Sequence, residues 1–353
     1  MSKELWKGNE AIAEAAIRAG VQCYFGYPIT PQSEIPEYMA KHLAEKGGVF
    51  VQSESEIAAI NMVYGASGAG ARVMTSSSSP GMSLKQEGIS YLAAAQLPCV
   101  IVSIMRGGPG LGTIQPAQGD YFQATRGGGN GDYRTIVLAP SSIQEAVDMT
   151  IEGFDLADDY RIPVIILADG MIGQMMEPIQ WPTITKKDFK AKPWATNGSK
   201  LERDHNIITS LFIEAKDALA HNMILEAKHR QITQEIQRFE TVNTKDAEVI
   251  FVAYGMVARI AQAAIKMLNQ QGIKAGLFRP QSVWPFPYEA LWETVNQKSV
   301  KQVVCLELSL GQLIDDVKIG VKGLKPIKFL GKVGGIVMTP DEIIEIVRGD
   351  VYV

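Results

Sequence analysis

Residues Cys99 to Met105, CVIVSIM, decide the fold class, because every side chain in this run except that of Ser103 is apolar. A short, near-continuous apolar run predicts a strand buried on both faces, as the strands of parallel sheets are. Around it, short apolar runs alternate with helical patterns such as residues 9–20, NEAIAEAAIRAG, which close on a glycine. We therefore expect an α/β fold with an open, mostly parallel sheet covered by helices on both sides.

The character of the sequence changes twice along the chain. Residues 1–180 carry the alternating pattern, and residues 181–246 begin with prolines, lysines and tryptophans that show no periodicity. This second segment continues as a polar stretch over about 200–241, which we interpret as a helical connector lying over a domain or reaching towards a partner. Residues 247–353 return to alternating strands and helices and predict a second, smaller α/β domain.

Composition excludes several classes of protein. With 46% apolar and 20% charged residues among 353, the chain has the make-up of a soluble globular protein. The net charge of -4, without a long block of either sign, argues against a nucleic-acid partner, which would require a basic patch. No apolar stretch reaches the roughly 18 residues that a membrane span needs. The first residues, MSKELWKGNEAI, lack a secretory apolar segment, so we expect a cytoplasmic protein that does not bind membranes.

The cysteines and histidines do not indicate a metal site in this chain. Cys23, Cys99 and Cys305 are far apart and lie in or beside apolar runs, as small buried hydrophobic residues do. Iron–sulfur ligation needs clustered thiolates, and none are present. The four histidines lack paired ligand spacing, so surface or hydrogen-bonded histidines are a better interpretation than zinc ligands.

Polar or glycine-rich segments follow four predicted strands of the first domain, at the edge where parallel sheets bind ligands. In residues 26–31, GYPITP, two prolines fix the backbone and leave Thr30 at a helix entrance, to cap the helix or to contact a ligand. In residues 52–56, QSESE, either acid is favoured at a helix N-terminus. Glu56 is followed at once by apolar residues, which predicts a sparsely hydrated carboxyl suited to proton chemistry.

The other two segments could hold anionic or polar groups. Residues 75–81, TSSSSPG, offer hydroxyls and backbone amides at a helix start, which can cradle an anion or a polar ring or simply cap the helix. Residues 106–113, RGGPGLGT, place Arg106 after the most buried strand, where it would bind a carboxylate bidentately or pair with an acidic side chain of a loop. The glycines fit neither the dinucleotide-binding nor the P-loop pattern.

In combination, the sequence resembles the α-type subunit of 2-oxoacid:ferredoxin oxidoreductases. The likeness covers nearly the whole chain, and the segments that carry it are GYPITP, ESEIAAINMVYGASGAGARVMTSSSSPGMSLKQEGISYLA, LPCVIVSIMRGGPGLGT, QGDYFQATRGGGNGDY, IVLAPSS, FRPQSVWPFP and LELSLGQ. The motifs SSSSPG and RGGPGLG are most similar to those of the branched-chain type, which acts on 3-methyl-2-oxobutanoate (2-oxoisovalerate). The 2-oxoglutarate type has similar motifs. The resemblance implies a thiamine-diphosphate pyrimidine-binding-like domain over residues 1–180 and a transketolase-C-terminal-like domain over 247–353.

The same resemblance implies roles for individual residues. Glu56 would bond N1′ of the thiamine aminopyrimidine; its rival is Glu54, but Glu56 has the family's spacing of nine residues before Gly65. Thr30 would contact an oxygen of the substrate, and Arg106 would hold the substrate carboxylate. The further cofactor-binding residues that we predict lie in the GYPITP and SSSSPG segments: Pro28, Ile29, Ser78 and Pro80.

Other parts of such an enzyme are missing from the sequence. The diphosphate and Mg²⁺ of thiamine enzymes are held by a G-D-G…N motif, and neither residues 131–133 nor 169–170 continue in that way. The resemblance implies a β-type subunit for the diphosphate and Mg²⁺, and a ferredoxin-like subunit for the iron–sulfur clusters. It leaves room for a γ-type subunit, and it makes CoA a co-substrate and ferredoxin the electron acceptor. The chain alone would be inactive.

Three alternatives stay open at this point. The same chemistry could act on 2-oxoglutarate, or at lower odds on indolepyruvate or pyruvate. A non-catalytic scaffold subunit could share the fold, although the presence of Glu56 and Arg106 speaks against it. A nicotinamide dehydrogenase is disfavoured by the missing glycine fingerprint and by the lack of a histidine near the strand ends.

Overall fold

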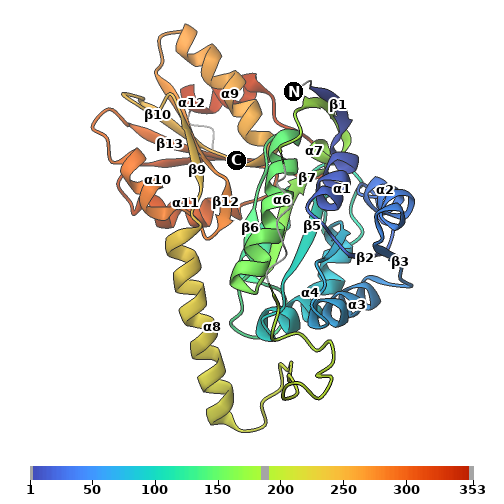
Figure 1. Ribbon diagram of the computed structural model, residues 1–353. Coiled ribbons are helices and arrows are strands. Elements are labelled where there is room, and N and C mark those ends of the chain that lie inside the picture. Colours follow the sequence, from blue (N-terminus) through green and yellow to red (C-terminus); the bar gives the residue numbers. More distant parts are fainter. Residues whose placement is uncertain (1–2, 184–190, 350–353) are drawn as a thin grey trace.

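Two sheets organise the part of the chain that the computed structural model describes, residues 3–183 and 191–349 (Figure 1). The larger sheet has seven strands in the order β12-β6-β7-β5-β4-β2-β3, and the smaller has five in the order β14-β13-β10-β11-β9. A short antiparallel ribbon of β1 (Glu4–Lys7) and β8 (Met176–Ile179) lies beside the larger sheet.

The larger sheet is parallel except for its edge strand β12. Its strands are β2 (Cys23–Gly26), β3 (Val49–Gln52), β4 (Val73–Ser77), β5 (Cys99–Met105), β6 (Ile136–Leu138), β7 (Pro163–Asp169) and β12 (Ser282–Trp284). The CVIVSIM run forms β5, in the middle of the sheet, and all of its side chains are buried. They alternate between two cores, with Ile101 on one face and Val102 on the other. The predicted mostly parallel α/β fold is confirmed.

Helices cover both faces of the larger sheet (Figure 1). On one face lie α1 (Gly8–Arg18), α2 (Glu34–His42), α6 (Ile143–Tyr160) and α7 (Gly170–Gln174), with a 3-10 turn at Ala44–Lys46. On the other face α3 (Glu56–Gly68) packs against α4 (Ser79–Ala94), and the short α5 (Tyr121–Arg126) follows. Ser55 caps α3 by accepting a hydrogen bond from the Ala58 amide (3.2 Å), so this helix begins directly at Glu56.

The smaller sheet repeats the same construction. Its strands are β9 (Phe239–Val242), β10 (Val249–Val252), β11 (Ala275–Pro280), β13 (Gln302–Glu307) and β14 (Ile327–Gly331), and only β9 is antiparallel to its neighbour. Helices α9 (Gly255–Gln270) and α12 (Pro340–Arg348) pack together against it, as do α10 (Tyr288–Val295) and α11 (Leu313–Val321).

The connector is helical over a shorter range than the sequence predicts. Helix α8 runs from Ala215 to Glu235 and extends away from the smaller sheet along the larger one (Figure 1). Residues 200–214 are not helical, and Phe239 begins strand β9. The sequence FETV alternates in the manner of a strand, and its pairing with β11 outweighs the helical pattern before it.

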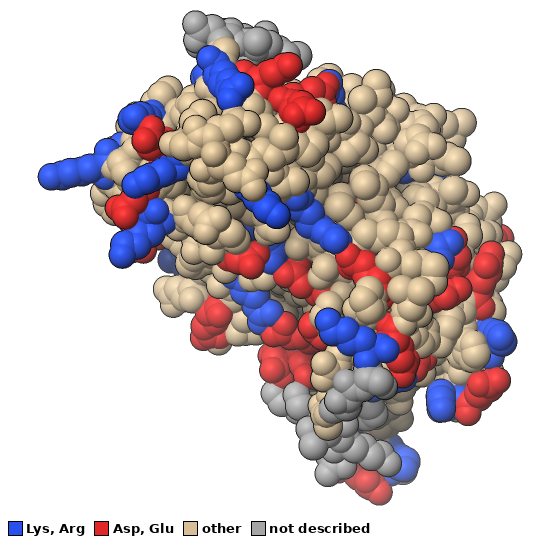
Figure 2. Space-filling model, turned by 90° about the horizontal axis from the view of Figure 1, so that it is seen from above, with Lys and Arg blue, Asp and Glu red and all other residues tan. Residues whose placement is uncertain are grey.

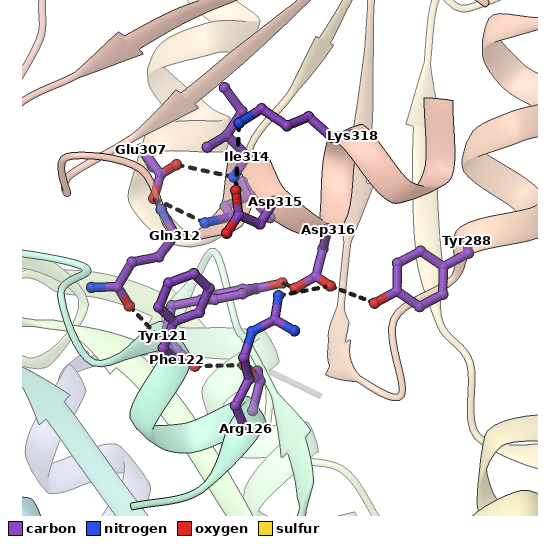
Figure 3. A network of polar contacts seen from close by, with 12 residues as sticks. Tyr121, Phe122, Arg126, Tyr288, Glu307, Gln312, Ile314, Asp315, Asp316 and Lys318 are labelled. Carbon is purple, nitrogen blue, oxygen red and sulfur yellow. Dashed lines mark hydrogen bonds and ion pairs between the residues drawn. The ribbon is translucent and has the colours of Figure 1, made fainter. Parts of the chain in front are cut away.

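A polar network ties the two α/β units together, and Figure 3 shows its centre. The buried carboxylate of Asp316 on α11 accepts hydrogen bonds from Tyr121 (2.7 Å), from Tyr288 and from Arg126 (3.3 Å). Glu307, at the end of β13, accepts from the Leu313 and Ile314 amides at the start of α11. This buried acid therefore caps α11 from outside the helix.

Gln312 and Gln118 complete the contact between the units. Gln312 accepts from the Phe122 amide (2.7 Å) and donates to the Gly119 carbonyl (2.7 Å). Gln118 is fully buried and exchanges hydrogen bonds with the backbone of Leu308 at 2.9 and 3.0 Å. These bonds fix the LELSLGQ segment of the smaller unit against the loop that follows β5.

The surface carries both signs of charge. Figure 2 shows basic and acidic side chains interspersed on one face of the molecule, without a continuous basic patch there. Within the described residues, no helix combines the length and the apolar character that a membrane crossing requires.

Candidate functional site

The predicted site residues gather at one edge of the larger sheet. Thr30, Glu56, Ser78 and Arg106 follow the ends of β2, β3, β4 and β5, respectively. Because these four strands are parallel, their carboxyl ends lie at the same edge. The structure therefore places four segments that are far apart in sequence along a single border.

Glu56 is buried at the first position of α3, with 6% of its surface exposed. Its carboxyl lies against α4 where that helix has no side chain: a Cβ atom on Gly81 would lie 2.6 Å from Glu56 Oε1. The rival acid, Glu54, is exposed. The carboxyl that is shielded from water is thus the one that the sequence favours.

Two serine hydroxyls at the end of β4 have no hydrogen-bond partner among the described residues. Ser77 Oγ and Ser78 Oγ are both buried, and Ser77 Oγ would lie 2.1 Å from a Cβ atom on Gly81. Ser78 occupies the N-cap position of α4, but its side chain makes no capping bond. The simpler interpretation of this serine as a helix cap is therefore wrong, and its hydroxyl remains available to a ligand.

Arg106 is 9% exposed and is held by backbone carbonyls rather than by an acid. Its guanidinium donates to the Thr30 carbonyl (2.9 Å) and to the Leu111 carbonyl (3.0 Å), while Nε has no partner in the described residues. No carboxylate among those residues pairs with it, so the alternative of a loop salt bridge is wrong. The positive charge of Arg106 remains uncompensated at the sheet edge.

Thr30 does not cap a helix. Helix α2 begins four residues later, at Glu34, and Thr30 lies exposed in a turn before a cis peptide bond to Pro31. Two prolines in six residues keep this turn outside the helix. Pro28 is also exposed and Ile29 is half-buried, so the GYPITP segment presents a surface at the sheet edge.

A hollow of about 400 Å³ opens next to Arg106, between the two α/β units. Ser79 and Pro80 line it from α4, and Leu308, Gln312 and Gly334 line it from the smaller unit. The sequence did not predict that the smaller unit contributes to this wall. The one indication in the sequence was the LELSLGQ segment, which is among the segments that resemble the family.

Asp120 in the wall of this hollow was also not predicted. It accepts a hydrogen bond from Ser79 Oγ (2.6 Å), and the Arg106 amide donates to the same serine oxygen (3.0 Å). Burial raises the pKa of Asp120 to about 6, although the hydrogen bond from Ser79 acts in the opposite direction. An acid with a raised pKa in a concave site is a common feature of functional sites.

Lys85 is a further charged residue that sequence reasoning missed. It lies fully buried on α4, one helical turn after Gly81, and donates to Thr75 Oγ1 (3.0 Å). Burial lowers the pKa of this amine to about 7, and the Glu56 carboxyl acts to raise it. Nothing in the pattern around LKQEG marks this lysine as buried, because lysines on helices usually face solvent.

Polar groups without partners at the carboxyl edge of a parallel sheet are typical of α/β enzymes, whose ligands bind at that edge. Two family models match this chain. Residues 14–243 match the pyruvate flavodoxin/ferredoxin oxidoreductase thiamine diphosphate-binding model, and residues 247–343 match pyruvate:ferredoxin oxidoreductase core domain II. The chain therefore belongs to the pyruvate flavodoxin/ferredoxin oxidoreductase family, and it is an oxidoreductase subunit with a thiamine diphosphate-binding domain.

Curated relatives are similar to this chain along nearly its full length. The ketoisovalerate oxidoreductase subunit VorB of Methanothermobacter marburgensis is 45% identical, covering 99% of this chain and 98% of the relative. The 2-oxoglutarate synthase subunit KorA of Methanocaldococcus jannaschii is 36% identical, covering 99% of this chain and 100% of the relative. The predicted resemblance to α-type subunits of 2-oxoacid:ferredoxin oxidoreductases is confirmed, and such subunits are components of multi-subunit enzymes.

Solved structures show the same architecture. A 2-oxoglutarate:ferredoxin oxidoreductase from Magnetococcus marinus, solved with 2-oxoglutarate, coenzyme A and succinyl-CoA bound, superposes with a TM-score of 0.88 at 27% identity. The match covers 98% of this chain, which spans 65% of that longer one. A split-gene transketolase (inactive beta4 tetramer) superposes with a TM-score of 0.60 at 16% identity over 97% of both chains, which shows the fold alone.

The cysteines do not form a cluster. Cys99 and Cys305 are buried in different sheets and Cys23 is half-buried, and all three are unpaired. Among residues 3–183 and 191–349, no group of three His, Cys, Asp or Glu side chains is placed to hold a metal ion.

We expect Asp120→Asn to stabilise the protein in a pH-dependent way. The pKa of Asp120 rises from its ordinary 3.8 to about 6 on folding, so between these values the folded state holds a proton that the unfolded chain releases. Stability from this group is therefore lost as the pH rises from about 4 to about 6. In thermal melts, Asp120→Asn should exceed the wild type by a few degrees above pH 6.5 and match it near pH 4. The exposed Asp132→Asn is the control, and a gain that is equal at every pH would contradict this account.

Proposed function

We propose that this chain holds the aminopyrimidine end of thiamine diphosphate in a branched-chain 2-oxoacid:ferredoxin oxidoreductase, with 3-methyl-2-oxobutanoate (2-oxoisovalerate) as the substrate. The enzyme would convert the 2-oxoacid and CoA into acyl-CoA and CO2 and pass the electrons to ferredoxin. The observation that carries this proposal is the pair formed by Glu56 and Arg106, both buried at one sheet edge and neither in an ion pair with the described residues. The substrate choice is supported by the higher identity to the ketoisovalerate enzyme, 45% against 36%.

The residues beside Glu56 fit a polar aromatic ring. An aminopyrimidine offers hydrogen-bond donors and acceptors around its edge, and the unpartnered hydroxyls of Ser77 and Ser78 can do either. Glycine at position 81 leaves the carboxyl of Glu56 uncovered by a side chain from α4. We infer that Glu56, Ser78 and Pro80, with the turn at Pro28 and Ile29, would hold the ring. When bound, thiamine diphosphate supplies the carbon nucleophile that adds to the 2-oxo group.

The role of Glu56 follows from its burial. A carboxyl shielded from water exchanges its proton with a facing ring nitrogen rather than with solvent, so it can hold a proton at that nitrogen when the reaction needs one there. Glu54 cannot take this role, because it is exposed to solvent.

Arg106 and Thr30 would bind the substrate. The two carbonyls that Arg106 contacts fix the plane of its guanidinium. A carboxylate that reaches the remaining N–H groups would be oriented before decarboxylation. Thr30 is joined to Arg106 through its carbonyl and has its hydroxyl at the exposed edge, where it could reach an oxygen of the substrate.

The rest of the reaction would be supplied by other chains. We infer a β-type subunit that binds the diphosphate and Mg²⁺, and a ferredoxin-like subunit that carries iron–sulfur clusters, with a γ-type subunit as a further component.

A second candidate is the same chemistry on 2-oxoglutarate. It is favoured by the TM-score of 0.88 with the Magnetococcus marinus enzyme, whose structure holds 2-oxoglutarate. The two candidates share every role given above and differ only in the side chain of the substrate.

Viologen reduction over a panel of 2-oxoacids tests the function directly. We expect the co-expressed complex, supplied with CoA and thiamine diphosphate, to reduce viologen fastest with 2-oxoisovalerate. A preference for 2-oxoglutarate would overturn the substrate while keeping the chemistry. No reduction with any 2-oxoacid, by a complex whose clusters are intact, would overturn the function itself.

Glu56→Gln should leave the complex assembled and reduce turnover at least about 100-fold, since general acid–base groups contribute about 10²–10⁴-fold. Gel filtration and viologen reduction measure the two properties. Glu54→Gln is the matched control, because it changes an exposed acid two residues away and should retain activity. Full activity of Glu56→Gln would refute the assignment of this carboxyl.

Arg106→Ala should raise the KM for the 2-oxoacid by about 10-fold or more, because a charged hydrogen bond to a carboxylate is worth about 1.5–3 kcal/mol. The Kd for thiamine diphosphate, measured by calorimetry, should change much less. Arg230→Ala removes an arginine whose side chain is 73% exposed and serves as the control. An equal loss in both constants would mean that Arg106 supports the site as a whole rather than the substrate.

A further inference from the structure

Lys85 lies behind Glu56 in a polar layer between α4 and β4. Thr75 and Ser77 alternate with Ser76 along β4, so they project from the same face of the strand, towards α4. Lys85 contacts Thr75, and four residues earlier Gly81 lies against both Ser77 and Glu56. Residues four apart share one face of a helix, so Lys85 and the Glu56 carboxyl lie along the same face of α4.

The Lys85 amine makes fewer hydrogen bonds than it can donate. Lys85 is fully buried and makes one hydrogen bond within the described residues, to the neutral hydroxyl of Thr75 (3.0 Å). It does not form a direct ion pair with Glu56. Burying a charged amine with one neutral partner is costly, so it requires a compensating charge nearby.

Glu56 is the charged group that can compensate it. The other charged or titratable side chains around α4 are engaged elsewhere: Arg106 with two carbonyls, Asp120 with Ser79, and Asp169 with the amides of Met171, Ile172 and Met256. The carboxyl of Glu56 has no hydrogen bond to the described residues, and among those residues its charge is the one that acts to raise the pKa of the Lys85 amine. The two groups therefore depend on each other for charge balance.

We propose that Lys85 is a positioning residue for Glu56: its buried amine lies behind the carboxyl, balances its negative charge and so holds the carboxyl in place towards the ring nitrogen that it would face. This inference rests on the proposed role of Glu56 as the cofactor-facing acid. It adds a residue of this chain that touches neither substrate nor cofactor and acts through Glu56 alone.

The first test measures the pH dependence of thiamine diphosphate binding to cofactor-depleted complex by calorimetry. Lys85→Met removes the amine at similar length and leaves the Glu56 carboxyl without its counterpart, so the pH midpoint of thiamine diphosphate binding should move up by about half a pH unit or more. Lys85→Arg retains the charge and should restore the midpoint. Lys41→Met, at an exposed lysine, should leave it unchanged. In a Glu56→Gln background, the same Lys85→Met change should leave the pH midpoint of binding unchanged.

The second test is a thermal double-mutant cycle on the assembled complex. Each of Lys85→Met and Glu56→Gln leaves the other group without its counterpart, so each alone should lower the Tm by several degrees. The double variant should lose at least about 3 °C less than the sum of the two. Lys85→Gln replaces Lys85→Met in both tests if the methionine variant does not assemble.

The outcomes separate this inference from the function on which it rests. Full turnover in Glu56→Gln overturns the role of Glu56 and the inference with it. Loss of turnover in Glu56→Gln, together with an unmoved midpoint in Lys85→Met and additive Tm losses, overturns the inference alone and makes Lys85 a purely structural residue.

Discussion

The close packing of α3 against α4 is the contact on which the site depends. Two glycines of α4 make it possible: a Cβ atom on Gly88 would lie 2.5 Å from Ile60, and one on Gly81 would lie 2.6 Å from Glu56. Because neither glycine carries a side chain, α3 can approach until its first residue is buried against the start of α4. The depth of Glu56 is thus set by backbone packing, which is stiff, rather than by the rotamer of a long side chain.

The second constraint is the attachment of the smaller α/β unit. Its LELSLGQ segment is hydrogen-bonded to the loop after β5 by Gln118 and Gln312, and the Asp316 network adds a buried acid between two tyrosines. These bonds place Leu308 and Gln312 in the wall of the hollow beside Arg106. The hollow is therefore a product of both units, and a change in their relative position would alter it.

Much of this arrangement could be predicted from local pattern. The CVIVSIM run, the helix beginning at Glu56 and the four segments at the sheet edge required only periodicity and the rule that parallel strands end together. Residues whose environment arises from tertiary packing could not be predicted. Lys85 has the sequence context of a surface lysine, and Asp120 lies in a segment whose local pattern indicates no site. The alternative of a helix cap at Thr30 is wrong for the opposite reason, because the local pattern of a cap occurs in a turn that two prolines hold outside the helix.

The distribution of unsatisfied polar atoms gives an independent reason to regard this edge as an incomplete site. A buried polar group without a partner costs about 1–3 kcal/mol, so folded proteins keep few of them. Six such atoms occur in the described residues, and four of them, Ser77 Oγ, Ser78 Oγ, Ser103 Oγ and Arg106 Nε, lie at or near the carboxyl ends of β4 and β5; the other two are Asn9 Oδ1 and Lys192 Nζ. Ser77 and Ser103 are paired neighbours on these two strands. A protein that holds so many unsatisfied groups in one place gives up stability there, and binding of a ligand with complementary polar atoms would recover it. The same polar atoms would then favour the ligand-bound state over the free one. A sheet edge with unpaired hydrogen-bonding groups is therefore selective for a ligand whose polar atoms pair with them.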